Sequence, residues 1–227
     1  MAYFKYAYRQ GGENGVMNPR EYYIATGTAI EEGEIVLQTP GTGIAAVSGT
    51  DFNDPAIGIA SENHDGSTAG RQSGTAIKVY DDPNCVFSLK STNVITATDG
   101  STTTFVVAGL LPQTDNLWIG GYLEIVSCAA DSSLNGKMIK ITDSTGSTGT
   151  LTFDTQIAAF ASGDTAYLHP GKLAIGEYGW DLTSDGTDVD WDTSGGEALV
   201  LVDADPERKL SYWKLRLHQL GNDAAAK

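Results

Sequence analysis

The runs YYIAT (22–26), GEIVLQ (33–38), AIGIA (56–60) and TAIKVY (75–80) decide the fold class of this chain. Each run is about as long as a strand, is rich in β-branched residues, and is bounded by Gly, Asp, Asn, Pro or Ser. None is long or periodic enough to indicate a helix. The stretch 22–90 therefore predicts an all-β fold.

A second group of strand-like runs lies between Asn93 and Leu168, at residues 105–107, 122–126, 138–141, 150–153 and 163–168. Asn135-Gly136, a strong hairpin-turn signal, directly precedes one of them. Five or six strands at such regular spacing predict a small β-barrel or sandwich. We interpret 93–168 as a β-module inserted into a discontinuous β domain formed by 22–92 plus 169–227.

The last part of the chain holds two further strand candidates. Residues 197–202 form an apolar run typical of a buried strand. In 212–218, apolar and polar residues alternate as in a half-buried strand. A helix is the alternative, because Leu210, Trp213, Leu217 and Leu220 would share one helical face.

Residues 1–21 are predicted to form an arm outside the core, because Gly11–Gly15 breaks the segment and Asn18-Pro19 marks a turn. Its aromatic and basic residues suggest contact with another molecule. The alternative is that the aromatic residues fold back onto the domain's own surface. An arm predicts that the chain stays folded without residues 1–20. The candidate interface residues are Tyr3, Phe4, Lys5, Tyr6, Tyr8 and Arg9.

Composition excludes several partners. The chain has 14 basic and 29 acidic residues, a formal net charge of −15, which disfavours nucleic-acid binding. No stretch has the ~18 apolar residues of a membrane helix, and no secretory signal is visible, so we expect assembly in a cytoplasm without a membrane partner. The two cysteines, Cys85 and Cys128, are predicted to be reduced, partly buried thiols.

The acidic segment 181–192 is the best candidate metal site. Asp188, Asp190 and Asp192 have the spacing that opens an EF-hand loop. Thr193 and Leu199 stand where that loop requires glycine and glutamate, so an EF-hand is rejected. A solvated acidic face is the favoured interpretation, with Val189 and Trp191 pointing the other way.

No other motif indicates chemistry. No Gly-x-Ser-x-Gly elbow marks a nucleophile, and the tryptophans are expected in cores or interfaces. We therefore predict a protein that is not an enzyme, with no catalytic residues, no cofactor and no metal. The histidines, which are isolated in sequence and form no zinc motif, are His64, His169 and His218.

The 22–90 stretch resembles the phage capsid decoration, or cement, proteins. The resemblance rests on the turn AIEEGEIV (29–36), the element PAIGIA (55–60) and the strand AIKVY (76–80). The segment 93–168 separately resembles β-modules common in phage structural proteins, through its Thr-rich entry, its LEI strand (123–125) and its closing GDT (163–165).

The resemblance implies a virion protein that binds the outer surface of an expanded capsid. It would contact the major capsid protein, often as a homotrimer at threefold positions, and stabilise the shell by bridging capsomers. The alternative is a tail, fibre or baseplate component whose β-module binds glycans. A third possibility is an acidic secreted hydrolase or lectin domain.

Overall fold

The computed structural model describes residues 3–9, 19–24, 29–39, 43–46, 56–66, 76–82, 84–110, 113–176, 178–182, 188–191 and 199–215. The predicted fold class is confirmed: the protein is all-β, with 50% strand, 8% helix and three antiparallel sheets. The helical residues belong to short 3-10 turns: η1 (Ser132–Leu134), η2 (Gly146–Thr148), η3 (Lys172–Ala174) and η4 (Pro206–Arg208).

The first sheet has five strands in the order β2-β6-β5-β3-β4. The strand-like runs of 22–80 supply most of it, and alternation along β6 buries Ile77 and Val79 while exposing Lys78. The strands are β2 (Arg20–Tyr23), β3 (Ile35–Thr39), β4 (Gly43–Ala46), β5 (Ala56–Ala60) and β6 (Ala76–Tyr80).

The second sheet has six strands in the order β1-β7-β18-β17-β15-β16. It unites the beginning, the middle and the end of the chain. The run at 197–202 is a strand, and the alternation after residue 209 also belongs to a strand, not a helix. The strands are β1 (Lys5–Arg9), β7 (Cys85–Leu89), β15 (Tyr178–Leu182), β16 (Val189–Asp190), β17 (Leu199–Asp205) and β18 (Leu210–Leu215).

The third sheet has seven strands in the order β8-β14-β11-β12-β13-β10-β9. All seven lie between Val94 and His169, so this sheet is made by the segment 93–168 and the residue after it. That this segment is an inserted barrel or sandwich stays a prediction. The strands are β8 (Val94–Thr96), β9 (Asp99–Gly100), β10 (Thr104–Val106), β11 (Tyr122–Ser127), β12 (Met138–Thr145), β13 (Thr150–Phe153) and β14 (Thr165–His169).

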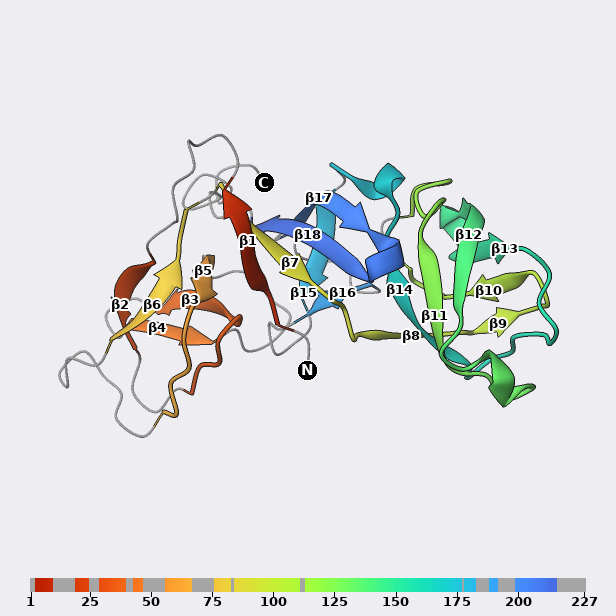
Figure 1. Cartoon of the computed structure of the whole chain (residues 1–227), viewed down its shortest axis with the longest axis horizontal. Coiled ribbons are helices and arrows are strands. Elements are labelled where there is room, and N and C mark those ends of the chain that lie inside the picture. The colour runs from red at the N-terminus through yellow and green to blue at the C-terminus, as the bar shows by residue number, and fades with distance from the viewer. Residues whose placement is uncertain are drawn as a thin grey trace.

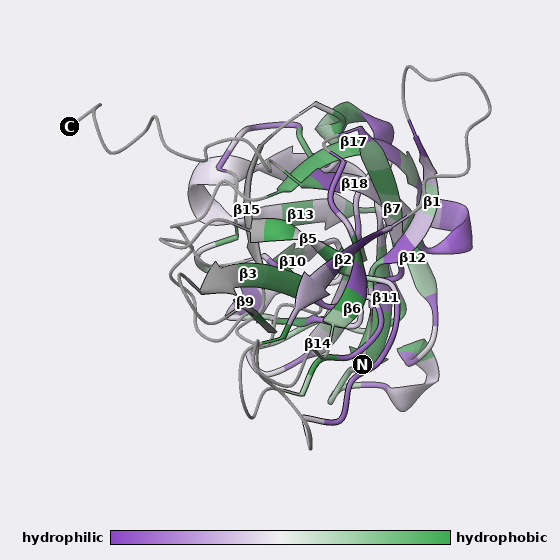
Figure 2. Ribbon diagram, turned by 90° about the vertical axis from the view of Figure 1, so that its left-hand side faces the viewer, coloured by the Kyte–Doolittle hydropathy of each residue, from purple (hydrophilic) through white to green (hydrophobic). Residues whose placement is uncertain are grey.

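The three sheets lie in a row along the longest axis of the molecule (Figure 1). The six-stranded sheet is in the middle, with the five-stranded sheet on one side and the seven-stranded sheet on the other. Figure 2, viewed along that row, shows hydrophobic residues along β3, β7 and β17. All three strands contribute buried side chains to a core.

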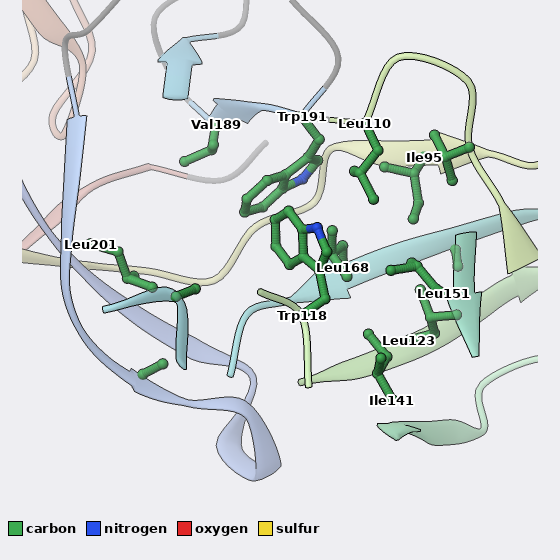
Figure 3. Packing of buried hydrophobic residues seen from close by; sticks show 14 of the residues in the cluster. Ile95, Leu110, Trp118, Leu123, Ile141, Leu151, Leu168, Val189, Trp191 and Leu201 are labelled. Carbon is green, nitrogen blue, oxygen red and sulfur yellow. The ribbon is translucent and has the colours of Figure 1, made fainter. Parts of the chain in front are cut away.

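One large hydrophobic core joins the six-stranded sheet to the seven-stranded sheet. Its centre is a run of buried tryptophans. The ring of Trp191 lies 5.8 Å from that of Trp118 (Figure 3). It also lies 6.2 Å from that of Trp213. Trp118 precedes β11 and Trp213 lies in β18, so the contact fixes the two sheets against each other. These tryptophans confirm the expected core role; the Trp180 side chain lies outside the described residues.

The five-stranded sheet has a smaller core of its own. Seven aliphatic side chains fill it, and none is more than 2% exposed. They are Ile24, Ile30, Val36, Ile44, Ala60, Ile77 and Val79.

The predicted arm is wrong for residues 3–9, because these residues belong to the body. Lys5–Arg9 pairs with β7 as the edge strand of the six-stranded sheet. Phe4 is only 2% exposed, and its N–H donates to the Gly33 carbonyl at 3.2 Å. Gly33 has φ +87°, and a Cβ there would lie 2.5 Å from the Phe4 oxygen, so only glycine fits this contact. Residues 10–18 lie outside the described part.

Candidate functional site

A groove of about 940 Å³ lies between the six-stranded and seven-stranded sheets. We call it the junction groove. One wall consists of residues from β1, β7, β17 and β18, and the other of residues from β11, β12 and the turn before β11. The short turns η3 and η4 form its rim. Figure 1 shows the β17–β18 turn reaching across to the strands of the seven-stranded sheet.

A bulge in β1 determines which side chain faces the groove. Tyr6 pairs with Phe87, but Tyr8 pairs with Val86, so one residue of β1 is unpaired between them. Because directly opposed residues share a face of the sheet, Tyr6 and Tyr8 point to opposite faces. The ring contacts agree: Tyr6 stacks on Tyr80 at 4.9 Å, whereas Tyr8 lies 6.3 Å from Tyr212.

A second bulge does the same in β17. Leu201 pairs with Trp213 and points into the core, whereas Asp203 pairs with Tyr212. In a regular strand, Leu201 and Asp203 would share the buried face. The bulge instead turns the Asp203 carboxylate to the face of Tyr212, where both line the groove.

An ion-pair network ties the two walls together. Lys209 Nζ, in the β17–β18 turn, lies 2.6 Å from Glu124 Oε1 on β11. The other oxygen, Glu124 Oε2, lies 3.2 Å from His169 Nε2. Lys209 has φ +60°, a strained backbone for a residue other than glycine, and its ammonium anchors that turn to the opposite sheet.

The network sets the charge state of its members. Burial lowers the pKa of His169 below its usual 6.5, more than Glu124 raises it. Burial alone would raise the pKa of Glu124, but hydrogen bonds from Lys209 and His169 outweigh it and hold that pKa below its usual range. At neutral pH the junction therefore contains a neutral imidazole at His169 and a carboxylate at Glu124.

The six residues expected at an interface divide into two groups. Phe4 is buried in the core, and Tyr3 and Tyr6 are half-buried, with the Tyr3 hydroxyl donating to Glu31. Lys5, Tyr8 and Arg9 are exposed, and Arg9 Nε lies 2.8 Å from Asp82. Their contact with a partner stays a prediction, and Phe4 is withdrawn from it because its side chain is covered.

The solvated acidic face is wrong for Asp188, which is only 4% exposed. Its Oδ2 accepts hydrogen bonds from the backbone N–H groups of Thr92, at 2.6 Å, and Asn93, at 2.9 Å. Asp188 therefore fastens the link between β7 and β8 to the segment before β16. Val189 and Trp191 are buried as expected, and Asp192 lies outside the described residues.

The remaining candidates from the sequence are the cysteines, His218, a metal site and a membrane helix. Cys85 and Cys128 are free and buried, as predicted, and burial raises the pKa of Cys85 to about 11. Among the described residues, no three or more His, Cys, Asp or Glu side chains gather to hold a metal ion. None of the described helices is long and apolar enough to cross a membrane. His218 lies outside the described residues.

No family model matches the chain, and no curated protein or solved structure is similar enough to count as a match.

Proposed function

We propose that the protein is a phage virion structural protein that binds the outer surface of the assembled capsid and stabilises it by bridging capsomers. In this role it contacts the major capsid protein, works by contact without catalysis, and acts as a homotrimer. The resemblance of 22–90 to capsid decoration proteins is one support. The others come from the surface of the molecule.

The observation that carries the proposal is the distribution of exposed apolar side chains along the row of sheets. Tyr23 on the five-stranded sheet is 49% exposed, and Tyr8 on the six-stranded sheet is 40% exposed. Ile157, after the β13 strand of the seven-stranded sheet, is 69% exposed. A protein that bridges neighbouring subunits needs contact residues at several separate places, and tyrosine is enriched at such interfaces.

An open sheet edge offers a second kind of contact. Within the described residues, β1 pairs with β7 alone, so its other edge is unpaired. A strand from a neighbouring subunit can add to such an edge through main-chain hydrogen bonds. The contact with a partner that the sequence places on an N-terminal arm is therefore proposed for the edge of β1, where Lys5 and Tyr8 are exposed.

The net charge suits an outer position. A protein with a net charge of −15 makes decorated particles repel one another. Binding only to the assembled shell stabilises that shell by mass action.

The test is co-sedimentation of the purified protein with expanded shells of its own virus that lack it. We expect saturable binding at a fixed ratio to the capsid protein, and weaker binding to unexpanded shells, which serve as the control. Among the variants Tyr8→Ser, Tyr23→Ser and Ile157→Ser, at least one weakens binding by about tenfold or more, as an interface hot spot would. Protein that stays in the supernatant at every ratio overturns the proposal and favours the tail, fibre or baseplate alternative.

A further inference from the structure

The junction groove has the size and the construction of a ligand site. Its volume of about 940 Å³ lies at the upper end of the roughly 300–1,000 Å³ typical of small-molecule pockets. Bulges in β1 and β17 turn Tyr8 and Asp203 to the same side of one sheet, on either side of Tyr212. Bulges are frequent beside functional sites, where they re-aim a side chain in this way.

The side chains that line the groove combine aromatic rings with both signs of charge. Tyr8 and Tyr212 come from one wall and Tyr122 from the other. Lys140 and Lys172 supply hydrogen-bond donors, and carboxylates such as Asp203 supply acceptors. Asp203 uses Oδ1 to accept the Ala204 N–H at 2.8 Å, which fixes the carboxylate and leaves Oδ2 for other contacts.

We propose that the junction groove binds a neutral oligosaccharide. A sugar ring has a C–H face, which packs on an aromatic ring, and a rim of hydroxyls that both donate and accept hydrogen bonds. The three tyrosines, the lysines and the carboxylates of the lining match both properties. Of the carboxylates in the lining, Asp205 pairs with Arg208 at 3.5 Å, which leaves Asp203 and Glu207 against Lys140 and Lys172. This balance of charge favours a neutral ligand over a polyion of either sign.

The two walls are held in place without a ligand. The Lys209–Glu124 ion pair joins them at the β17–β18 turn, and the Trp118–Trp191–Trp213 contact joins the sheets beneath. A groove fixed in this way loses little conformational freedom on binding, which favours recognition of a weakly held sugar. The site needs both sheets, so it is not a property of the segment 93–168 alone.

Oligosaccharide binding in the junction groove also does not depend on capsid binding, and the two proposals can fail separately.

The test uses the full chain with maltohexaose, cellohexaose, β-1,4-mannohexaose and β-1,4-galactohexaose as probes. Saturation-transfer NMR and isothermal titration calorimetry measure the binding of each. We expect at least one probe to bind with a Kd of about 1 mM or tighter, in the range of weak specific recognition. Tyr8→Ala and Asp203→Asn should each weaken it by about tenfold or more.

The matched control is Tyr23→Ala, since Tyr23 is another exposed tyrosine, on the five-stranded sheet and outside the groove lining. This variant should bind the same probe as the parent does. Circular dichroism establishes that each variant is folded, and Lys172→Ala, at an exposed turn, provides a second groove variant if Tyr8→Ala unfolds. Failure of all four probes to bind, or binding that is unchanged in every folded groove variant, overturns the proposal.

Discussion

Asp188 shows how the role of a single residue depends on parts of the chain that are distant in sequence. Its spacing from Asp190 and Asp192 indicates an exposed acidic face. Its hydrogen-bond partners, Thr92 and Asn93, lie 96 and 95 residues earlier in the chain. No local pattern specifies such a pairing, so the sequence predicts the carboxylate and not its burial.

Replacing Asp188 tests this structural role. Asp188→Ala removes the buried carboxylate that accepts from the N–H groups of Thr92 and Asn93, and a hydrogen bond to a charged group contributes about 1.5–3 kcal/mol. We expect equilibrium urea unfolding to show a loss of at least about 2 kcal/mol for Asp188→Ala, and much less for the half-buried Asp190→Asn. This structural role would be contradicted if both variants had equally negligible effects. It would also be contradicted if the melting temperature of the parent depended on calcium.

His169 makes stability depend on pH. It is 3% exposed and lies 3.2 Å from Glu124. The positive charges of Lys209 and Lys90 also act on the imidazole and disfavour its protonation. Burial lowers the pKa of the folded imidazole below 6.5, so the unfolded chain takes up the proton first as the pH falls. The contribution of His169 to stability is therefore complete above about pH 6.5 and is lost as the pH falls through the folded-state pKa.

The measurement is the free energy of unfolding at several pH values between about 7.5 and 5.5, where Glu124 stays ionised because its pKa lies below 4.5. His169→Gln keeps a donor for Glu124 but does not titrate. We expect the parent to lose stability more steeply than this variant as the pH falls. Identical slopes would show that the imidazole does not contribute.

At the scale of strands, the strongest signals are the most reliable. Alternating or continuous apolar runs identify β3, β5, β6, β11 and β17. A strand buried on one face needs alternating apolar residues, and a strand buried on both faces needs a continuous apolar run. The sequence pattern does not identify β1 as a strand. Its run, KYAYR, is short and rich in polar atoms, and its bulge breaks the alternation at Ala7. It becomes a strand only because β7 supplies a partner edge some 80 residues later.

Removing this strand should therefore damage the fold. Deleting residues 1–9 removes β1 and takes Phe4 out of the core, and loss of a buried phenylalanine side chain alone costs about 3–5 kcal/mol. We expect Phe4→Ala to lower the free energy of unfolding by this order, and the deletion to lower it at least as much. Lys5→Ala, on the exposed neighbour, is the control and should change it by less than about 0.5 kcal/mol. A truncated chain as stable as the parent would restore the detached arm.

At the scale of the whole molecule, the sequence predicts the all-β class but not the site. The junction groove takes Tyr8 from one end of the chain, Tyr122 from the middle and Tyr212 from the other end. These residues are brought together by sheet order and by two bulges, and neither is encoded by spacing. The tryptophans are easier to interpret, because large apolar side chains are expected in cores wherever they occur.

We propose that this row of sheets works as a clamp on an assembled shell. The most direct measurement is the temperature at which expanded shells come apart, followed by calorimetry as purified protein is added. A clamp that binds only the intact shell raises this temperature with protein concentration until its sites are filled. We expect that saturable rise. A disruption temperature that is the same with and without saturating protein would contradict it.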